Sequence, residues 1–217
     1  MLKVSVLVSA IGAVLFATAC TPSEEADVDE TASSPTPDMV EPEPEPKNIT
    51  LASNGDTLSP DAWTKTGNGE LTSDTTGLLM TDVDGEAYGK YRLRVPLEAG
   101  IFELSVSATL SAPSGETDLV SLRVFTRDNA ISHDVNILPA TGEVLLRDAD
   151  DPAVESTVLD FTDDVASIEL TFNCCDSAEE VIVEVFPGAG TEGIRYDASG
   201  EGTVTLTSLE VNALAIP

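Results

Sequence analysis

IFELSVSATL, residues 101–110, decides the fold class of this 217-residue chain. Apolar side chains recur at every second position from Phe102 to Leu110, with polar ones such as Glu103 and Ser105 between them. A period of two places the two sets on opposite faces of an extended chain. The segment therefore predicts a β-strand with one buried and one solvated face.

Further strand-like segments follow the same alternation, and clusters of Gly, Pro, Asp and Asn separate them. They are residues 49–53, 77–83, 86–95, 119–126, 131–138, 143–147, 156–161, 166–173, 181–186 and 202–211. No ten-residue segment carries an amphipathic helical stripe. We expect residues 49–217 to form one all-β domain, an antiparallel, jelly-roll-like β-sandwich whose two sheets bury the apolar faces.

One stretch, EAYGKYRLRVPLEAGIFELSVSATLSA (86–112), is similar to a known family when taken with GTVTLTSLEV (202–211). It resembles the galactose-binding-like jelly roll of many carbohydrate-binding modules, in which a strand with aromatic and basic residues turns into one of the form Y-x-L-S-V-x-A. Pro96 and Gly100 frame the corresponding turn, and Phe102 stands where the family often has Tyr. The resemblance covers most of residues 49–217 in outline and implies the fold, with the last strand beside the first. It implies less about function, since jelly rolls have many functions.

The N-terminus predicts export. Lys3 precedes an apolar run over residues 4–16 that is short for a membrane span, and residues 1–19 have the pattern of a signal peptide. LFATAC resembles the lipobox of bacterial lipoproteins, which implies cleavage before Cys20 and lipidation of its thiol. An ordinary signal peptide ending at Ala19 is the competing interpretation. In enteric bacteria Asp after the cysteine favours the inner membrane, so Thr21 implies the outer membrane of the cell envelope.

Residues 20–48 predict a disordered tether. The segment from residue 21 holds nine acidic residues, one Lys and six Pro, and almost no large apolar side chain. Such a chain buries too little surface to offset its conformational entropy, and EPEPEP favours extended polyproline geometry. The tether would hold the sandwich away from the membrane.

The charge of the domain excludes one class of partner. Residues 49–217 keep 30 of the 39 acidic and 8 of the 10 basic residues, a net charge near −22. Nucleic acids and anionic membrane surfaces need clustered Lys and Arg, so neither is expected to bind the domain. The acidity indicates either solubility in a salty medium or calcium-rich or cationic partners.

Residues suited to catalysis are scarce. His133 is the only histidine, and the contiguous Ser132, His133 and Asp134 would alternate faces along a strand, so they cannot form a triad by themselves. We expect His133 on the surface or on an edge strand. One His and two spare Cys also make a zinc site unfavourable. The sequence does not predict an enzyme.

Sugar binding needs aromatic faces together with orienting polar groups. Trp63, in the polar segment SPDAWTKTGNGE, is a candidate stacking platform, although it would serve equally as a plug at one end of the sandwich. Tyr196 lies beside Arg195 in the Gly-rich stretch PGAGTEGIRYDASGEG, a long loop in which both are candidate binding residues.

A second candidate binding surface follows the strand at residues 86–95. Alternation places Tyr88 on the same face as Lys90, Arg92 and Arg94, with Tyr91 on the opposite face, so we expect one of the two tyrosines in the core and the other exposed. Tyr88 and Arg92 are the residues of this face that we select as ligand-binding candidates. An ordinary solvated strand face has the same pattern.

Calcium is the candidate cofactor. TDVDGE offers Asp82, Asp84 and Glu86, and RDADD (147–151) offers a second acidic group. Hard oxygen ligands suit calcium, and the resemblance implies a structural ion of this kind. Neither stretch has EF-hand spacing, and plain acidic turns are the alternative.

Cys174 and Cys175 are adjacent in FNCCDS, in a compartment that favours disulfides. A straight strand would point them to opposite faces, but the surrounding residues predict a turn, where the two side chains can converge. Adjacent Cα atoms lie about 3.8 Å apart, closer than in an ordinary disulfide. We expect a strained vicinal disulfide whose exposed sulfurs form a flat apolar platform; one buried thiol, or bridges to a second chain, are alternatives.

Together these features predict a non-catalytic binding lipoprotein, tethered to the membrane by its lipid anchor, that binds a glycan or another extracellular ligand. The alternative is a structural or assembly lipoprotein of the envelope whose sandwich docks another protein. A large exposed apolar patch would favour the alternative.

Overall fold

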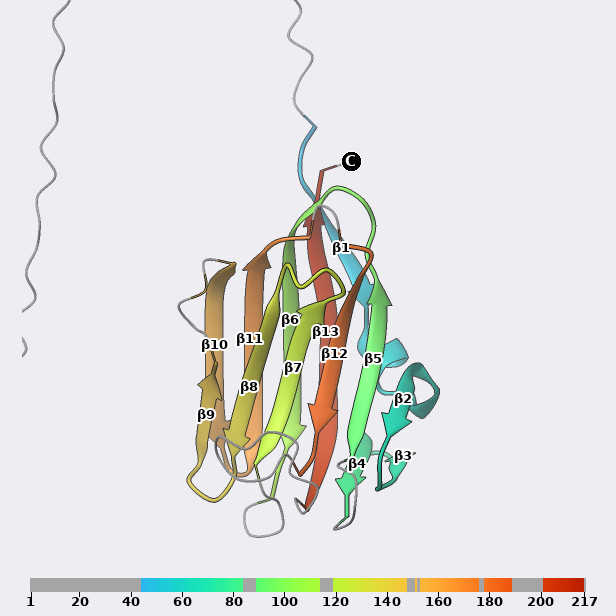
Figure 1. Ribbon diagram of the computed structural model, residues 1–217, viewed down its shortest axis with the longest axis vertical. Coiled ribbons are helices and arrows are strands. Elements are labelled where there is room, and N and C mark those ends of the chain that lie inside the picture. Colours follow the sequence, from blue (N-terminus) through green and yellow to red (C-terminus); the bar gives the residue numbers. More distant parts are fainter. Residues whose placement is uncertain are drawn as a thin grey trace, which may run out of the picture. The chain divides into compact units, whose positions relative to one another are not determined.

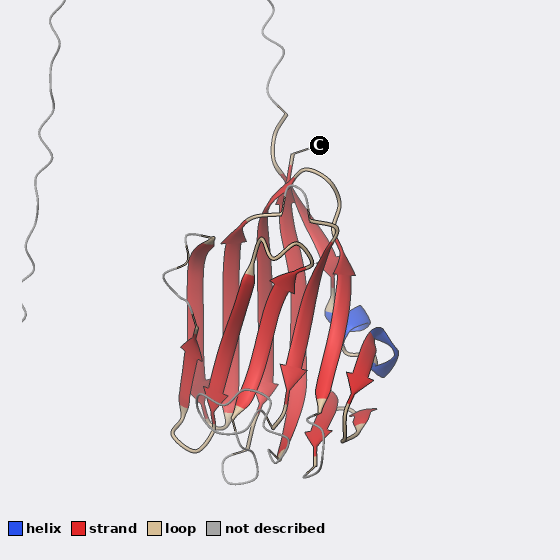
Figure 2. Ribbon diagram, in the orientation of Figure 1, coloured by secondary structure: helices blue, strands red, loops and turns tan. Residues whose placement is uncertain are grey.

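The computed structural model describes residues 44–83, 89–113, 119–147, 151, 153–175, 178–188 and 201–216. Within them, thirteen strands form two antiparallel sheets that lie one behind the other (Figure 1). The only helices among these residues are two short ones, α1 (Asn54–Thr57) and η1 (Pro60–Ala62), shown in blue in Figure 2. The prediction of an all-β sandwich is confirmed.

Sheet A has seven strands. Its order is β10 (Val154–Thr162), β11 (Val165–Asn173), β6 (Ile101–Ser111), β13 (Gly202–Ala215), β4 (Leu78–Asp82) and β3 (Leu71–Ser73), with β1 (Lys47–Ala52) also paired to β13. The first and last strands are therefore neighbours, as the family resemblance implied.

Sheet B has six strands. Its order is β2 (Trp63–Thr66), β5 (Lys90–Pro96), β12 (Glu180–Phe186), β7 (Val120–Thr126), β8 (Ser132–Leu138) and β9 (Glu143–Leu146). Consecutive strands of the chain alternate between the sheets at several points, so residues distant in sequence meet across one face.

The core lies between the sheets and is built from the alternating apolar positions. On β6, Leu104, Val106, Ala108 and Leu110 are buried, and the serines between them face outward. From sheet B, residues such as Leu122 face them across the interface. Burial of large apolar side chains contributes roughly 1.5–3 kcal/mol each and is the main term that stabilises the sandwich.

The structure corrects three details of the predicted strands. Trp63 begins strand β2 and Leu71 begins β3, two strands that were not predicted. Phe102, predicted to face inward, is 36% exposed. The register shifts between Leu214 and Ala215, opposite the start of β6, and this bulge takes Phe102 out of the inward alternation.

No helix in the described part of the chain is long and apolar enough to span a membrane. Residues 1–43, which carry the signal-peptide and Cys20 predictions and most of the predicted tether, lie outside the described residues. The tether was predicted to extend to residue 48, but Lys47 and Asn48 belong to β1 and pair with β13, so the sandwich begins earlier than predicted.

Candidate functional site

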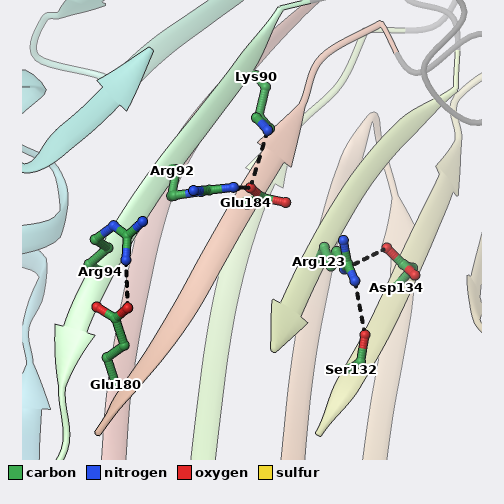
Figure 3. A network of polar contacts seen from close by, with 8 residues as sticks. All are labelled: Lys90, Arg92, Arg94, Arg123, Ser132, Asp134, Glu180 and Glu184. Atoms are coloured by element: carbon green, nitrogen blue, oxygen red, sulfur yellow. Dashed lines mark hydrogen bonds and ion pairs between the residues drawn. The ribbon is translucent and has the colours of Figure 1, made fainter. Parts of the chain in front are cut away.

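A row of charged side chains crosses the outer face of sheet B, the face turned away from sheet A. Arg92 on β5, Glu184 on β12, Arg123 on β7 and Asp134 on β8 are successive partners in the strand register. Figure 3 shows them side by side, with charges that alternate in sign from one strand to the next. We name these four residues the charged row.

Glu184 is the most deeply buried member of the row, with a side chain only 2% exposed. Arg92 contacts its Oε1 atom with Nε at 2.7 Å and Nη2 at 2.5 Å, and the Lys90 ammonium lies 3.6 Å from the same oxygen. A buried carboxylate without such partners would cost several kcal/mol. The two cations are what allow Glu184 to interrupt the apolar run VIVEVF.

Arg123 is held from three sides. Its Nη2 donates to Ser132 Oγ at 3.0 Å, its Nε lies 3.9 Å from Asp134 Oδ1, and its guanidinium carbon is 4.5 Å from the centre of the Phe125 ring. A guanidinium over an aromatic face gains about 0.5–1 kcal/mol at an exposed site. The row is thus a set of side chains already fixed in position.

Two polar atoms beside the row are buried without a partner. Ser121 and Asn136 face each other across β7 and β8, and neither Ser121 Oγ nor Asn136 Oδ1 has a hydrogen-bond partner within the described residues. An unsatisfied buried polar atom costs about 1–3 kcal/mol, and in native proteins water, ions or ligands often complete such groups. This part of sheet B is therefore suited to accept hydrogen bonds from a ligand.

Trp63 does not offer a stacking face. It is 7% exposed, and its indole nitrogen donates to the Thr57 carbonyl oxygen at 2.6 Å. Because Trp63 lies opposite Leu93 on the inward side of β2, it packs against the core as the plug interpretation predicted. The platform interpretation of Trp63 is not supported.

The strand prediction for residues 90–95 is confirmed. Tyr91 is fully buried, and its hydroxyl oxygen lies within hydrogen-bond distance of two carbonyl oxygens, 2.9 Å from that of Glu70 and 2.6 Å from that of Thr81. Lys90 and Arg92 lie on the opposite face, as does Arg94, whose Nη1 binds Glu180 at 2.5 Å. The other selected residues of the candidate binding surfaces, Tyr88, Arg195 and Tyr196, lie outside the described residues.

His133 is fully buried, which corrects the expected position on the surface or an edge strand. It faces inward on β8, and β9 covers that strand's far side, so β8 is interior to the sheet. Its ring stacks on Phe172 with centroids 5.3 Å apart. Ser132 and Asp134 face outward, so the three residues form no triad.

Cys174 and Cys175 form the vicinal disulfide, with Cα atoms 3.7 Å apart, in the turn that follows β11. Cys175 has a positive φ of 91°, the left-handed backbone that brings the neighbouring side chains together. Cys175 is only 5% exposed and belongs to the core, while Cys174 is half-buried. The expected platform of exposed sulfurs is therefore wrong; the disulfide packs against the sandwich.

Asp82 ends β4 as a buried carboxylate, 4% exposed. Burial raises the pKa of Asp82 from 3.8 to about 6, although the backbone N–H groups of Gly89 and Val83 favour the charged form. Neither carboxylate oxygen has a hydrogen-bond partner of good geometry within the described residues. A carboxylate in this setting gains from any cation that reaches it.

Oxygen atoms from two segments converge beside Gly89. A Cβ at that position would lie 2.7 Å from the Asn68 carbonyl oxygen and 3.0 Å from Asp82 Oδ1. Hard oxygens of this kind suit calcium, so Asp82 fits the predicted ion. Asp84 and Glu86 lie outside the described residues, and no cluster of three metal-binding side chains occurs among the residues the structure describes. Calcium at this position stays a prediction.

Three members of the charged row, Glu184, Arg123 and Asp134, were not selected from the sequence. The sequence does contain a signal for Glu184, because it is the one acidic residue in VIVEVF (181–186), where all other residues are apolar. Glu184 comes to lie beside Arg92 only because β12 pairs with β5, a strand that is far from it in the chain.

Comparison with known proteins finds no family model and no curated protein that matches this chain. Among solved structures, the enzymatically active domain of a bacteriophage CBA120 tailspike protein is similar with a TM-score of 0.43 and 12% identity, covering 76% of this chain and 21% of the tailspike chain.

Carbohydrate-binding modules are among the similar structures. A module described for its specific mannan recognition, TmCBM27, has a TM-score of 0.37 and 12% identity, with 77% of this chain and 98% of the module covered. The family 11 module of Clostridium thermocellum, in complex with a β-1,3-1,4-mixed-linked tetrasaccharide, has a TM-score of 0.38 and 9% identity, with coverage of 78% and 96%.

Proposed function

We propose that the domain is a non-catalytic glycan-binding module whose binding surface is the outer face of sheet B. The single observation that carries this proposal is the charged row, in which four neighbouring strands carry two ion pairs, Arg92 with Glu184 and Arg123 with Asp134. Planar carboxylates and guanidiniums can hydrogen-bond pairs of neighbouring sugar hydroxyls. Because the side chains are already ordered, binding costs less conformational entropy.

The same geometry supports a binding role over a catalytic one. A glycosidase needs one carboxyl group kept protonated as an acid and a second as base or nucleophile. Both carboxylates of the charged row are instead engaged by guanidinium groups, Glu184 by Arg92 and Asp134 by Arg123. Such groups are suited to hold a sugar in place.

The anchoring part of the proposal rests on the sequence. Cys20 carries the lipid, residues 21–46 form the tether up to the start of β1, and the sandwich is held at the bacterial outer membrane. One diacylated cysteine provides two acyl chains, and each buried methylene contributes about 0.8 kcal/mol to membrane attachment. Nothing in the sandwich then needs to contact lipid.

Protein docking, the alternative role, has no specific support among the described residues. Their exposed large apolar side chains come from different strands of both sheets, for example Phe102 on β6 of sheet A and Leu145 on β9 of sheet B.

A glycan array probed with the purified full chain tests the proposal. The matched variant is Arg92→Gln/Glu184→Gln, which removes both members of the Arg92–Glu184 pair together and keeps the charge of Lys90, the second cation beside Glu184. Glu169→Gln, on the outer face of sheet A, is the control. Binding to a defined sugar class that the double variant loses and the control keeps supports the proposal. No binding on the array, or equal binding by both variants, contradicts it.

A further inference from the structure

We propose that the glycan bound by sheet B is an anionic polysaccharide, recognised through repeated carboxylate or sulfate groups. This inference rests on the proposed function and specifies its ligand. It comes from the way charge is layered on the outer face of sheet B, which differs from the charge of the chain as a whole.

On this face the cations lie above the anions. The side chains of Arg94, Arg92 and Arg123 are 45%, 29% and 27% exposed, whereas those of Glu184 and Asp134 are 2% and 5% exposed. A ligand that approaches sheet B therefore meets guanidinium groups first, and the carboxylates that hold them lie beneath.

The guanidinium groups keep donors to offer. Among the contacts of the described residues, Arg92 directs Nε and Nη2 to a single Glu184 oxygen, and Arg94 uses Nη1 on Glu180. Arg123 uses Nη2 on Ser132, and its Nε is buried 3.9 Å from Asp134, which leaves Nη1 to offer. A guanidinium carries several N–H donors in one plane and matches carboxylate geometry with two of them at once. The remaining N–H groups are the ones that an anionic substituent would engage.

The distribution of charge selects this face. Eight of the ten lysines and arginines fall in the described residues, and four of these eight, Lys90, Arg92, Arg94 and Arg123, lie together on the outer face of sheet B. The outer face of sheet A instead presents acids such as Glu169. At physiological ionic strength charges are screened beyond about 8 Å, so local cations can outweigh the distant negative charge.

The spacing favours a polymer over a single small anion. Arg92 and Arg123 are separated by one strand, β12, which places their backbones about 10 Å apart. A chain with repeated anionic groups can engage both positions, and the second contact is then intramolecular and strengthens binding. A monovalent anion can engage only one of them.

Calorimetric titration of the full chain against matched polymers tests the inference. The probes are polygalacturonate, its carboxyl-reduced neutral form, a sulfated galactan and its desulfated form. We expect at least one charged polymer to bind at least tenfold more tightly than its neutral counterpart. Preference for the uronate or for the sulfated pair identifies which anionic group is recognised.

Substitutions test whether the cations of sheet B bind the charged polymer. Arg94→Gln, at an exposed position where folding is not at risk, and Arg92→Gln/Glu184→Gln should each weaken binding of the charged polymer about tenfold or more. Lys47→Gln removes the same charge from β1 of sheet A and should change binding less than twofold. Equal losses from Lys47→Gln and Arg94→Gln would show a nonspecific charge effect and overturn the inference.

The other outcomes separate this inference from the proposed function. If neutral and charged forms bind equally and Arg92→Gln/Glu184→Gln abolishes both, the glycan-binding function stands and the anionic ligand is wrong. If polyglutamate binds as tightly as the charged polysaccharides, the occupant is an acidic peptide and both proposals fail. If none of the polymers binds and the glycan array is also blank, both proposals fail as well.

Discussion

Replacing Asp82 by Asn should remove a pH dependence from the stability of the domain. The carboxyl is buried, and burial raises its pKa from 3.8 to about 6. The folded state therefore binds more protons than the unfolded state between these two values. Stability then falls as the pH rises through this window, since the unfolded chain can ionise Asp82 freely and the folded chain cannot.

The size of the effect follows from the pKa difference. A rise of about two pKa units, at about 1.4 kcal/mol for each, corresponds to about 3 kcal/mol between pH 4 and pH 7.5. Asp82→Asn is neutral at both pH values and should lose this part of the pH dependence. The variant should accordingly gain up to about 3 kcal/mol relative to the wild type on going from pH 4 to pH 7.5.

Urea denaturation with EDTA present, followed by the fluorescence of the buried Trp63, measures the free energy of unfolding of both proteins at the two pH values. The other acidic groups are shared, so their contributions cancel in the comparison. Identical pH dependence in wild type and variant would refute the reasoning. With calcium in place of EDTA, the wild type alone should gain stability at pH 7.5, because the ion binds the folded state.

Three further predictions concern other parts of the chain. Glu184→Gln should destabilise the fold by about 1–3 kcal/mol in urea unfolding, because Arg92 and Lys90 lose their buried partner; no change would mean that the pair is unimportant for folding. Because Cys174 and Cys175 form a disulfide, neither should be alkylated in denaturant until a reductant is added. Alkylation of these two residues without reductant would contradict the disulfide. Cys20→Ala should move the protein from the detergent phase to the aqueous phase in phase partitioning, whereas unchanged partitioning would exclude lipidation as the anchor.

The alternation of apolar and polar residues was enough to predict most strands of the fold. The strict period of two in residues 101–110 and in the segments that became β5, β7 and β11 reflects a sheet with one buried face, so strands and inward residues such as Leu104 and Tyr91 could be predicted. β2 (WTKT) and β3 (LTS) were not predicted, because each contains a single large apolar residue among polar ones and shows no alternation. The burial of His133 was missed because a polar residue on the inward face breaks the pattern that defines that face.

The candidate site could be predicted only in part. Lys90, Arg92 and Arg94 share one strand, so their common face follows from spacing. Glu184 joins them through pairing of β12 with β5, strands separated by several others in the chain, and sequence periodicity contains no information on which strands pair. The chemistry of the site is thus a property of the sheet order.

Hydrogen–deuterium exchange of the full chain, with and without the polysaccharide that binds it, tests the central claim most directly. Ligand contacts should slow exchange in β5, β12 and β7, the strands that carry Arg92, Glu184 and Arg123, while the strands of sheet A exchange as before. Protection confined to sheet A, or no protection with the ligand bound, would contradict the assignment of the binding surface to sheet B.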